Sequence, residues 1–319
     1  MATIEKRPID AVAVSAASID HVIRVRRLPA FDEKVIGALV GRLPGGTMAN
    51  FACALSRLGG RAAWMGTVGG DPEGAMLLRD FRRFRVDTQL ARVDRRRPSN
   101  FTVIFLGPSA ERAIVVVPSI RERLQAPARV QRSLTRASFL YLSPRDLGFA
   151  EQLSGIARGA GCRVAVEVEP TADLTLARAR RLLRHTDVLA LNRDGLATFL
   201  GIRGAISPMQ AERHARRLLF YGPHHVAVTL GRHGAILAGQ DQVAFHPGFR
   251  VNAVDTTGAG DCFSAALILG LCRGWPLPEI ASYANAAAAL STTGVGPRGF
   301  LPSDRDVQGL LRSGARRRE

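Results

Sequence analysis

Short apolar runs alternate with helical patterns along almost the whole chain, and this alternation restricts the possible folds more than any other feature of the sequence. Residues 11–15 (AVAVS) have the composition of a buried strand, and residues 48–60 form a helical pattern that ends in Gly59-Gly60. Further strands are predicted at residues 62–66, 138–143, 161–168, 186–192 and 224–231. Strands separated by helices form a mainly parallel sheet with helices on both faces, so the sequence predicts an α/β fold.

Two stretches interrupt the alternation, because each contains strand patterns with no helix between them. They are residues 18–46 and 99–119, and the second has the pattern of a hairpin around Gly107-Pro108. We expect both to form one small antiparallel sheet that projects from the main body as a lid, with lid segments at about 19–44 and 98–118. The sequence contains no repeats, low-complexity tracts or long linkers, which indicates a single domain over residues 1–319.

The net charge of +17 raises the question of nucleic-acid binding, but the origin of the charge argues against it. Of the 44 Lys and Arg residues, all except Lys6 and Lys34 are arginines. These arginines are scattered in short clusters and no nucleic-acid recognition motif accompanies them. We therefore expect no nucleic-acid partner.

Other features of the sequence concern the cellular compartment. No stretch approaches the roughly 18 uninterrupted apolar residues of a membrane span, and residues 1–10 lack the apolar segment of a secretory signal. The 4 cysteines show no C-x-x-C spacing, which indicates free thiols and neither zinc nor disulfides. We expect a cytoplasmic protein without a membrane partner.

Residues 254–263 (VDTTGAGDCF) carry the clearest chemical signal, because they stand between a strand pattern and a helical run. Gly258, Ala259 and Gly260 can turn their backbone N–H groups toward an anion at the positive end of that helix. A carboxylate beside a bound anion is electrostatically unfavourable, so we expect Asp261 to have a catalytic role. The obvious role is deprotonation of a hydroxyl nucleophile. The alternative is a plain turn in which Asp261 caps the helix.

A second segment, residues 44–74, contains a Gly-Gly turn, Asn50 four residues later, and a helix that ends in Leu-Gly. Together with the later DTTGAGD, in the same chain order, it resembles the PfkB/ribokinase family of sugar kinases. Three more segments match that family in order: residues 188–201, 228–238 and 284–299. The resemblance implies a ribokinase-like three-layer αβα fold with a mainly parallel central sheet and a small β-sheet lid.

The resemblance also implies a role for individual residues. Asp261 would be the catalytic base, and Gly258, Ala259 and Gly260 would form the anion hole for the transferred phosphoryl group. Hydroxyls of the acceptor would be held by Asp20, Gly45, Gly46 and Asn50. ATP would lie along Asn192, Thr229, Gly231, Gly234 and Asn285. Asp255 and the Thr257 carbonyl match the position of a monovalent cation.

Cofactors and partners follow from the same resemblance. ATP and Mg²⁺ are expected, with K⁺ as the monovalent cation. The lid of the family often forms a dimer interface, so a homodimer through the lid is expected.

The sequence departs from the family at two motifs. The N-x-x-E pattern reads Asn192-Arg193-Asp194-Gly195, so the Glu that helps to organise Mg²⁺ is replaced by glycine. Where ribokinases have a lysine after the Gly-Gly turn, this chain has Thr47-Met48, which argues against a plain ribokinase. Lys34 in the lid and Arg145 after a strand are candidates for contacts with the acceptor, although Arg145 could equally form a surface ion pair.

The resemblance implies ATP-dependent phosphorylation of a sugar primary hydroxyl. Lys34, Arg145 and the missing Glu resemble the branch of the family that contains ketohexose and sulfofructose kinases, so an anionic ketose such as sulfofructose is the first choice of acceptor. Two alternatives stay open: a nucleoside (adenosine-type) kinase, and a catalytically silent family member that binds a sugar.

Overall fold

The central sheet of the protein has nine strands in the order β13-β12-β11-β10-β9-β8-β1-β4-β5. The structure is a computed structural model that describes residues 7–15, 17–108, 112–170 and 174–314. Neighbouring strands from β11 to β5 are parallel, whereas β12 and β13 at one edge are antiparallel. The bounds are β1 Ile9–Val14, β4 Ala62–Gly69, β5 Asp87–Asp94, β8 Ala137–Leu142, β9 Arg163–Val168, β10 Val188–Asn192, β11 His225–Thr229, β12 Ala235–Gly239 and β13 Val243–His246.

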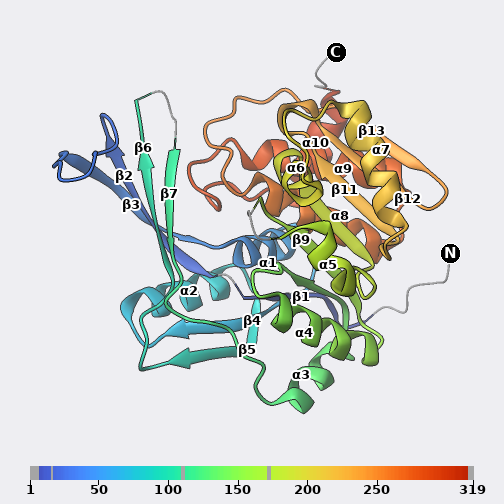
Figure 1. The fold of residues 1–319 in the computed structure, drawn as a ribbon, viewed down its shortest axis with the longest axis horizontal. Coiled ribbons are helices and arrows are strands. Elements are labelled where there is room, and N and C mark those ends of the chain that lie inside the picture. Colours follow the sequence, from blue (N-terminus) through green and yellow to red (C-terminus); the bar gives the residue numbers. More distant parts are fainter. Residues whose placement is uncertain (1–6, 16, 109–111, 171–173, 315–319) are drawn as a thin grey trace.

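Helices cover both faces of this sheet, which confirms the predicted three-layer α/β architecture (Figure 1). Alternate residues of β1 enter the two cores: Ala11 and Ala13 face one, and Val12 and Val14 face the other. One face carries α1 (Thr47–Arg57), α2 (Pro72–Arg83), α8 (Ala259–Arg273), α9 (Leu277–Ser291) and α10 (Asp304–Ser313). The other face carries α3 (Pro127–Leu134), α4 (Leu147–Gly159), α5 (Leu176–Leu183), α6 (Arg193–Leu200) and α7 (Pro208–Leu219).

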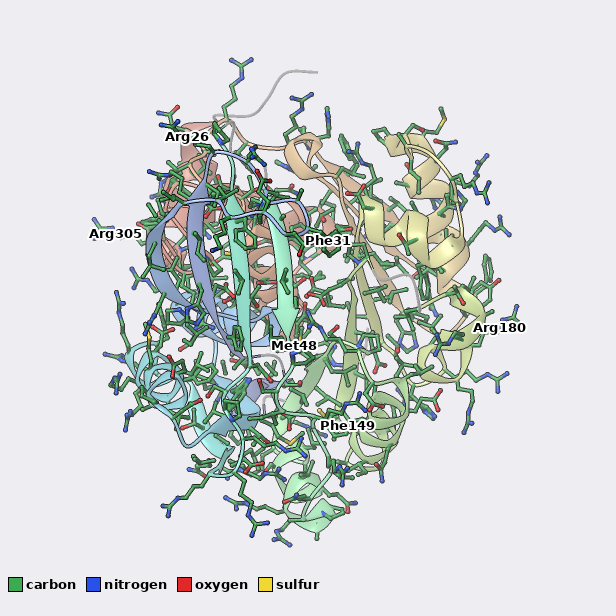
Figure 2. All side chains as sticks on the ribbon, turned by 60° about the vertical axis from the view of Figure 1, so that its left-hand side comes forward. Arg26, Phe31, Met48, Phe149, Arg180 and Arg305 are labelled. Atoms are coloured by element: carbon green, nitrogen blue, oxygen red, sulfur yellow. The ribbon has the colours of Figure 1, made fainter. Side chains whose placement is uncertain are left out.

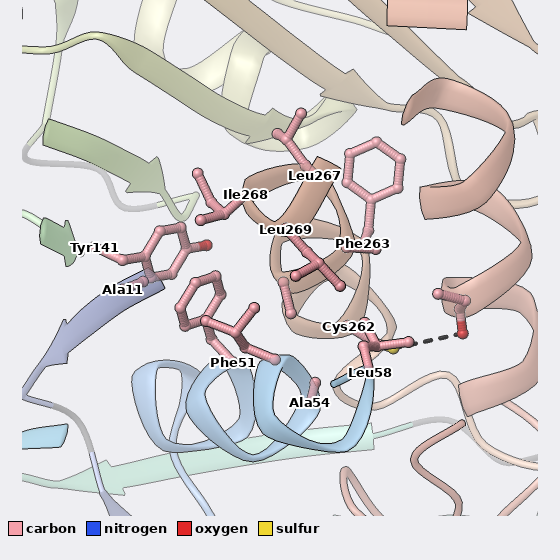
Figure 3. Close-up of a cluster of buried hydrophobic side chains, with 14 of the residues drawn as sticks. Ala11, Phe51, Ala54, Leu58, Tyr141, Cys262, Phe263, Leu267, Ile268 and Leu269 are labelled. Atoms are coloured by element: carbon pink, nitrogen blue, oxygen red, sulfur yellow. Dashed lines mark hydrogen bonds between the residues drawn. The ribbon is translucent and has the colours of Figure 1, made fainter. Parts of the chain in front are cut away.

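Helix α8 is apolar around nearly its whole circumference and runs through the core (Figure 3). Beside it, the rings of Phe51 and Tyr141 are stacked with centroids 3.7 Å apart. On its other side the Cys262 thiol donates to the Ala287 carbonyl of α9 at 3.4 Å. Because the helix is buried between α1, α9 and the sheet, its first turn is held in a fixed position at the carboxyl edge of the strands.

A second sheet forms the lid, with strand order β3-β2-β6-β7 (Figure 1). Its strands are β2 Ser18–Val25, β3 Gly37–Gly45, β6 Phe101–Leu106 and β7 Arg112–Val117. The outer pairs are antiparallel, including the hairpin expected around Gly107-Pro108, but the central pair β2–β6 is parallel. We expected antiparallel pairing throughout. The difference arises because β2 follows β1 and β6 follows β5, and β1 and β5 both end at the same edge of the parallel sheet.

The excess of arginine is spread around the molecule. Arg26, Arg180 and Arg305 lie at well-separated places on the periphery (Figure 2). Within the described residues, no helix combines the length and the apolar character that a membrane crossing requires.

Candidate active site

A cavity of about 1110 Å³ lies between the lid and the carboxyl edge of the central sheet. This is the edge at which parallel α/β sheets bind ligands. Its walls come from segments far apart in the sequence, and they include Asp20, Asn50, Thr102, Asn192, Gly258 and Asp261.

Asp261 is buried in the first turn of α8, where its carboxylate Oδ2 accepts a hydrogen bond from Asn50 Nδ2 at 2.7 Å. The N-cap of this helix is Gly258, and no side chain caps the helix. The interpretation of Asp261 as a simple cap therefore has no support in the structure. Its carboxylate instead faces Asn50 of α1, at the wall of the cavity.

The backbone before Asp261 is shaped for close approach. Gly258 has φ 79°, and a Cβ at this position would lie 2.9 Å from the Cα of Pro297, so a side chain has no room there. The N–H groups of Gly260 and Asp261 have no carbonyl partner within the described chain, as is usual for the first turn of a helix. These two donors and the helix dipole make this turn suitable for binding an anion.

Burial among other acids makes Asp261 a stronger base than an exposed carboxylate. Burial raises its pKa to about 7; the nearby carboxylates of Glu169 and Asp20 act in the same direction, whereas the bond from Asn50 and the charge of Arg298 oppose it. Glu167 lies in the same interior and accepts a hydrogen bond from the Tyr141 hydroxyl. Burial and the Asp261 carboxylate hold the pKa of Glu167 well above its usual range, which favours a protonated Glu167.

The base of the lid supplies a second buried carboxylate, Asp20 of β2. Burial raises its pKa to about 6, partly offset by hydrogen bonds from Thr102 and Ser18. Its carboxylate rests against Gly45, where a Cβ would lie 2.2 Å from Asp20 Oδ2. The adjoining Gly46, with φ 93°, is the N-cap of α1, and its carbonyl accepts the backbone N–H of Asn50 at 2.8 Å. The structure thus brings together Asp20, Gly45, Gly46, Asn50 and Asp261.

Arg298, which the sequence analysis did not select, connects this group. Its Nε donates to Asn50 Oδ1 at 2.9 Å, and its Nη2 donates to the Gly45 carbonyl at 3.0 Å. Its Nη1 is ion-paired with Asp80 of α2, and the Arg298 side chain is only 6% exposed. In a chain so rich in arginine, nothing in the sequence distinguishes this one, although it lies in one of the segments that match the family.

Two acids of the site were also missed, and here a signal was available. Glu167 and Glu169 alternate with apolar residues at the carboxyl end of β9, in the run VAVEVEP. Glu169 lines the cavity and accepts a hydrogen bond from Thr47 Oγ1 at 2.6 Å. A charged side chain inside an otherwise apolar strand needs a partner or a task, and both acids face the Asp261 side of the sheet.

The two cations proposed for the acceptor lie in different surroundings. Arg145 lines the cavity, but its Nε and Nη2 donate to Glu169 Oε2 at 3.1 and 2.8 Å. Lys34 is exposed in the connection between β2 and β3 and is not part of the cavity wall. The neighbouring Phe31 and Ile36 are fully solvent-exposed, so this connection extends into solvent and the structure does not bring Lys34 near Arg145.

The residues expected along ATP are only partly brought to the cavity. Asn192 lines it, and its side chain also caps α6 by accepting the Gly195 N–H at 2.6 Å. Thr229 is the strand neighbour of Asn192, and the turn between Gly231 and Gly234 follows directly. Asn285 is buried in α9, where its amide donates to the Ala281 carbonyl at 2.8 Å. The described wall of the cavity does not include Thr229, Gly231, Gly234 or Asn285.

Gly195, which stands in place of the expected Glu, has a steric explanation. A Cβ at this position would lie 2.9 Å from the Val168 carbonyl and 3.1 Å from Asn192 Oδ1. The start of α6 packs so closely against the end of β9 that only glycine fits without movement. The adjacent Asp194 is exposed and does not line the cavity, whereas Glu169 does.

The expected cation site contains a carboxylate that already has partners. Asp255 Oδ1 accepts the backbone N–H and the hydroxyl of Thr257 at 2.9 and 2.7 Å, and Oδ2 accepts the Gly296 N–H at 2.9 Å. Arg112 of the lid donates to the Thr257 hydroxyl, and its Nη1 lies 3.7 Å from Asp255 Oδ1. Partial burial raises the pKa of Asp255, but these bonds and the Arg112 charge outweigh it and lower the pKa overall.

No group of three or more metal-binding side chains occurs in the described part of the chain. Mg²⁺ commonly uses one or two protein carboxylates together with substrate phosphates and water. The Glu169 carboxylate at the cavity wall suits that kind of binding.

Comparison with known proteins identifies the family and the fold. A family model described as pfkB family carbohydrate kinase matches residues 9–304. A fructokinase of Klebsiella pneumoniae is 29% identical over 309 residues, covering 85% of this chain and 94% of the relative. A ribokinase of Haemophilus influenzae is 25% identical over 304 residues, covering 93% of this chain and 97% of the relative. The structure of Arabidopsis thaliana ribokinase complexed with ribose and ATP superimposes with a TM-score of 0.85 at 23% identity, covering 97% of this chain and 99% of that one.

Proposed function

This chain belongs to the pfkB family of carbohydrate kinases, which are ATP-dependent phosphotransferases, and on that basis we propose that it transfers the γ-phosphoryl group of ATP to a primary hydroxyl of a sugar. One observation carries the proposal: a buried carboxylate, Asp261, lies at the positive end of a helix in the wall of a large cavity. A base next to an anion-binding turn is the arrangement that phosphoryl transfer to a hydroxyl requires.

In the proposed reaction, Asp20, Asn50 and the Gly45-Gly46 turn hold the hydroxyls of the sugar. Asp261 takes the proton of the attacking sugar hydroxyl while the oxygen of that hydroxyl forms a bond to the γ-phosphorus. At the same time the bond between the γ-phosphorus and the β,γ-bridging oxygen breaks, which releases ADP. The N–H groups at the start of α8 stabilise the transferred group. Mg²⁺ bound with the nucleotide would neutralise charge on the phosphates. Closure of the lid would exclude water, which competes as an acceptor.

We further propose an anionic acceptor such as a sulfonated or phosphorylated ketose. Arg145 is already paired with Glu169, so Arg121 is the better candidate for binding the anionic group of the acceptor. Arg121 lines the cavity and also an adjoining hollow of about 430 Å³ with Arg92, Arg97 and Arg123. Within the described residues, no carboxylate pairs with Arg121. An arginine of this kind provides the planar fork that sulfonate and phosphate groups accept.

The alternatives have weaker support. A nucleoside acceptor is usually held by aromatic stacking, and Phe149 is the one aromatic residue in the described wall of the cavity. A silent sugar-binding protein would have no use for a base with the surroundings of Asp261.

We also propose a homodimer formed through the lid, in the cytoplasm. Its support is the exposed apolar surface of the lid strands that faces away from the cavity, where Leu39 and Val115 are 61% and 51% exposed. A K⁺ ion remains the proposed ligand of Asp255 and the Thr257 carbonyl, in competition with Arg112.

The test of the activity is a screen of acceptors in which release of ADP from Mg-ATP is measured. We expect turnover that depends on added sugar, with fructose 6-sulfonate or a ketose phosphate preferred to fructose and ribose. Arg121→Ala should raise the KM for the anionic sugar by about 10-fold or more while leaving that of a neutral sugar unchanged. Equal use of neutral and anionic sugars would contradict the anionic acceptor, and ATP turnover with no sugar would contradict the kinase.

A further inference from the structure

Arg298 joins three parts of the site that are far apart in the sequence. From the segment after α9 its guanidinium reaches Asn50 on α1, the Gly45 carbonyl at the end of β3, and Asp80 on α2. The guanidinium carbon Cζ of Arg298 also lies 5.8 Å from the centre of the Phe81 ring. The Arg298 side chain is only 6% exposed and makes all of these contacts at once.

The contact with Asn50 has a directional consequence. A side-chain amide can be turned by 180°, which exchanges its oxygen and its NH₂ group. Because a guanidinium can only donate, Arg298 selects the orientation in which Oδ1 faces Nε at 2.9 Å. In that orientation Nδ2 points at Asp261 and donates to Oδ2 at 2.7 Å. The opposite orientation would put two donors against each other and the amide oxygen against the carboxylate.

We propose that Arg298 is a positioning residue for Asp261, because it fixes the Asn50 amide in the orientation that holds the base. Through its bond to the Gly45 carbonyl, Arg298 also fixes the Gly45-Gly46 turn relative to that base. Arg298 is not part of the described cavity wall, so it acts through Asn50 and Gly45 rather than on the substrates. The inference rests on the proposed role of Asp261 as the base.

The charges around Asp261 make the effect of Arg298 measurable. Several titratable groups face this carboxylate from the surrounding elements, and Arg298 is the cation that lowers the pKa of both Asp261 and Asp20. The other groups are Asp20 from β2, Glu167 from β9 with its partner Tyr141 from β8, and Glu169 after β9. Arg145 is a second cation in this region, but it is paired with Glu169, so Arg298 is the cation whose loss should be felt most directly by Asp261.

The test compares Arg298→Met, Arg298→Lys and the matched control Arg57→Met. Arg57 donates to the Leu301 carbonyl at 3.2 Å, so its removal perturbs the same segment without touching Asn50. The titration of Asp261 is followed by carboxyl ¹³C NMR of the full-length protein without substrate, with Asp261→Asn used for assignment. The kcat and KM values are measured with the best acceptor from the screen.

We expect Arg298→Met to raise the pKa of Asp261 by about one unit and to lower kcat by about 10-fold or more. Arg298→Lys keeps the charge, so the pKa of Asp261 should stay near that of the wild type. Its kcat should still fall, because one ammonium group cannot reproduce the several hydrogen bonds of the planar guanidinium. Arg57→Met should change neither. An Arg298→Met protein with the titration and kcat of the wild type overturns the proposal. If that variant does not fold, an unchanged kcat in Arg298→Lys overturns it. An inactive wild type would contradict the proposed kinase activity, whereas the titration still decides the role of Arg298.

Discussion

A buried carboxylate is useful as a base and costly for stability, and Asp261 illustrates both effects. The folded protein holds the pKa of Asp261 at about 7, chiefly through burial, whereas the unfolded chain has the ordinary value of 3.8. Between these values the folded state binds more protons than the unfolded state. The contribution of Asp261 to stability therefore falls as pH rises from about 4 to about 7, and it stays low above that range. Asp20, with a pKa of about 6, acts in the same direction.

Asp261→Asn should consequently stabilise the protein at high pH, because the amide has no charge to bury. We expect a Tm about 2–6 °C above that of the wild type at pH 8, with the difference shrinking toward pH 4. Thermal unfolding measured across this pH range checks the prediction. Asp241→Asn in an exposed turn serves as the control and should follow the wild type. A wild type that is the more stable of the two at pH 8 would contradict the electrostatic account of this residue.

Arg112 connects the lid strand β7 with the loop that precedes α8. This arginine contacts both Asp255 and Thr257, the two residues that the family resemblance assigns to a monovalent cation. A guanidinium next to the Asp255 carboxylate supplies the charge that K⁺ would otherwise provide. Arg112 thus links the lid to the loop that leads into the anion-binding turn.

If Arg112 competes with the cation, K⁺ should affect the wild type weakly and Arg112→Met strongly. We expect K⁺, compared with tetramethylammonium at equal ionic strength, to raise the Tm and the rate of Arg112→Met several-fold more than those of the wild type. Arg42→Met is the matched control, because Arg42 is a lid arginine paired with Glu73 outside this turn. Equal K⁺ responses in all three proteins would contradict competition at Asp255.

At the scale of the whole molecule, the sequence predicts the layers better than the contacts between them. The strand β1 and its parallel neighbours are buried on both faces, so their apolar runs identify them directly. The direction of β2 relative to β6 depends on where each leaves the main sheet, which no local pattern records. β5 (Asp87–Asp94) was missed because its sequence DTQLARVD has few apolar residues at the edge of the sheet.

Some residues of the site could be predicted from short motifs, whereas others are identified only by contacts in the fold. Asp20, Asn50 and Asp261 belong to short motifs with a recognisable chemistry, and the fold brings them together. Arg298 meets Asn50 across 248 positions of the chain, and such a contact leaves no local trace. Lys34 is one of only two lysines in the chain, but the rarity of a residue type does not determine where the fold places it.

The lid is where the association of two copies is expected. Val115 is 51% exposed and does not belong to the described cavity wall, whereas its neighbours Ile114 and Val116 do. We expect the wild type to have twice the chain mass of 34.3 kDa in light scattering, and Val115→Lys to be a monomer. Met209→Lys on α7, which also replaces an exposed apolar residue, should stay dimeric. A monomeric wild type at micromolar concentration would contradict the dimer.

The most direct test of the central claim, that Asp261 is the base of a sugar kinase, is the pH dependence of kcat/KM for sugar-dependent ADP release in the wild type and in Asp261→Asn. The account predicts a wild-type rate that falls below a pH of about 7 as Asp261 becomes protonated. In Asp261→Asn it predicts a rate lower by about 10²–10⁴ without that limb, while ATP binding persists. A variant with near-normal turnover and the same acidic limb would contradict the account.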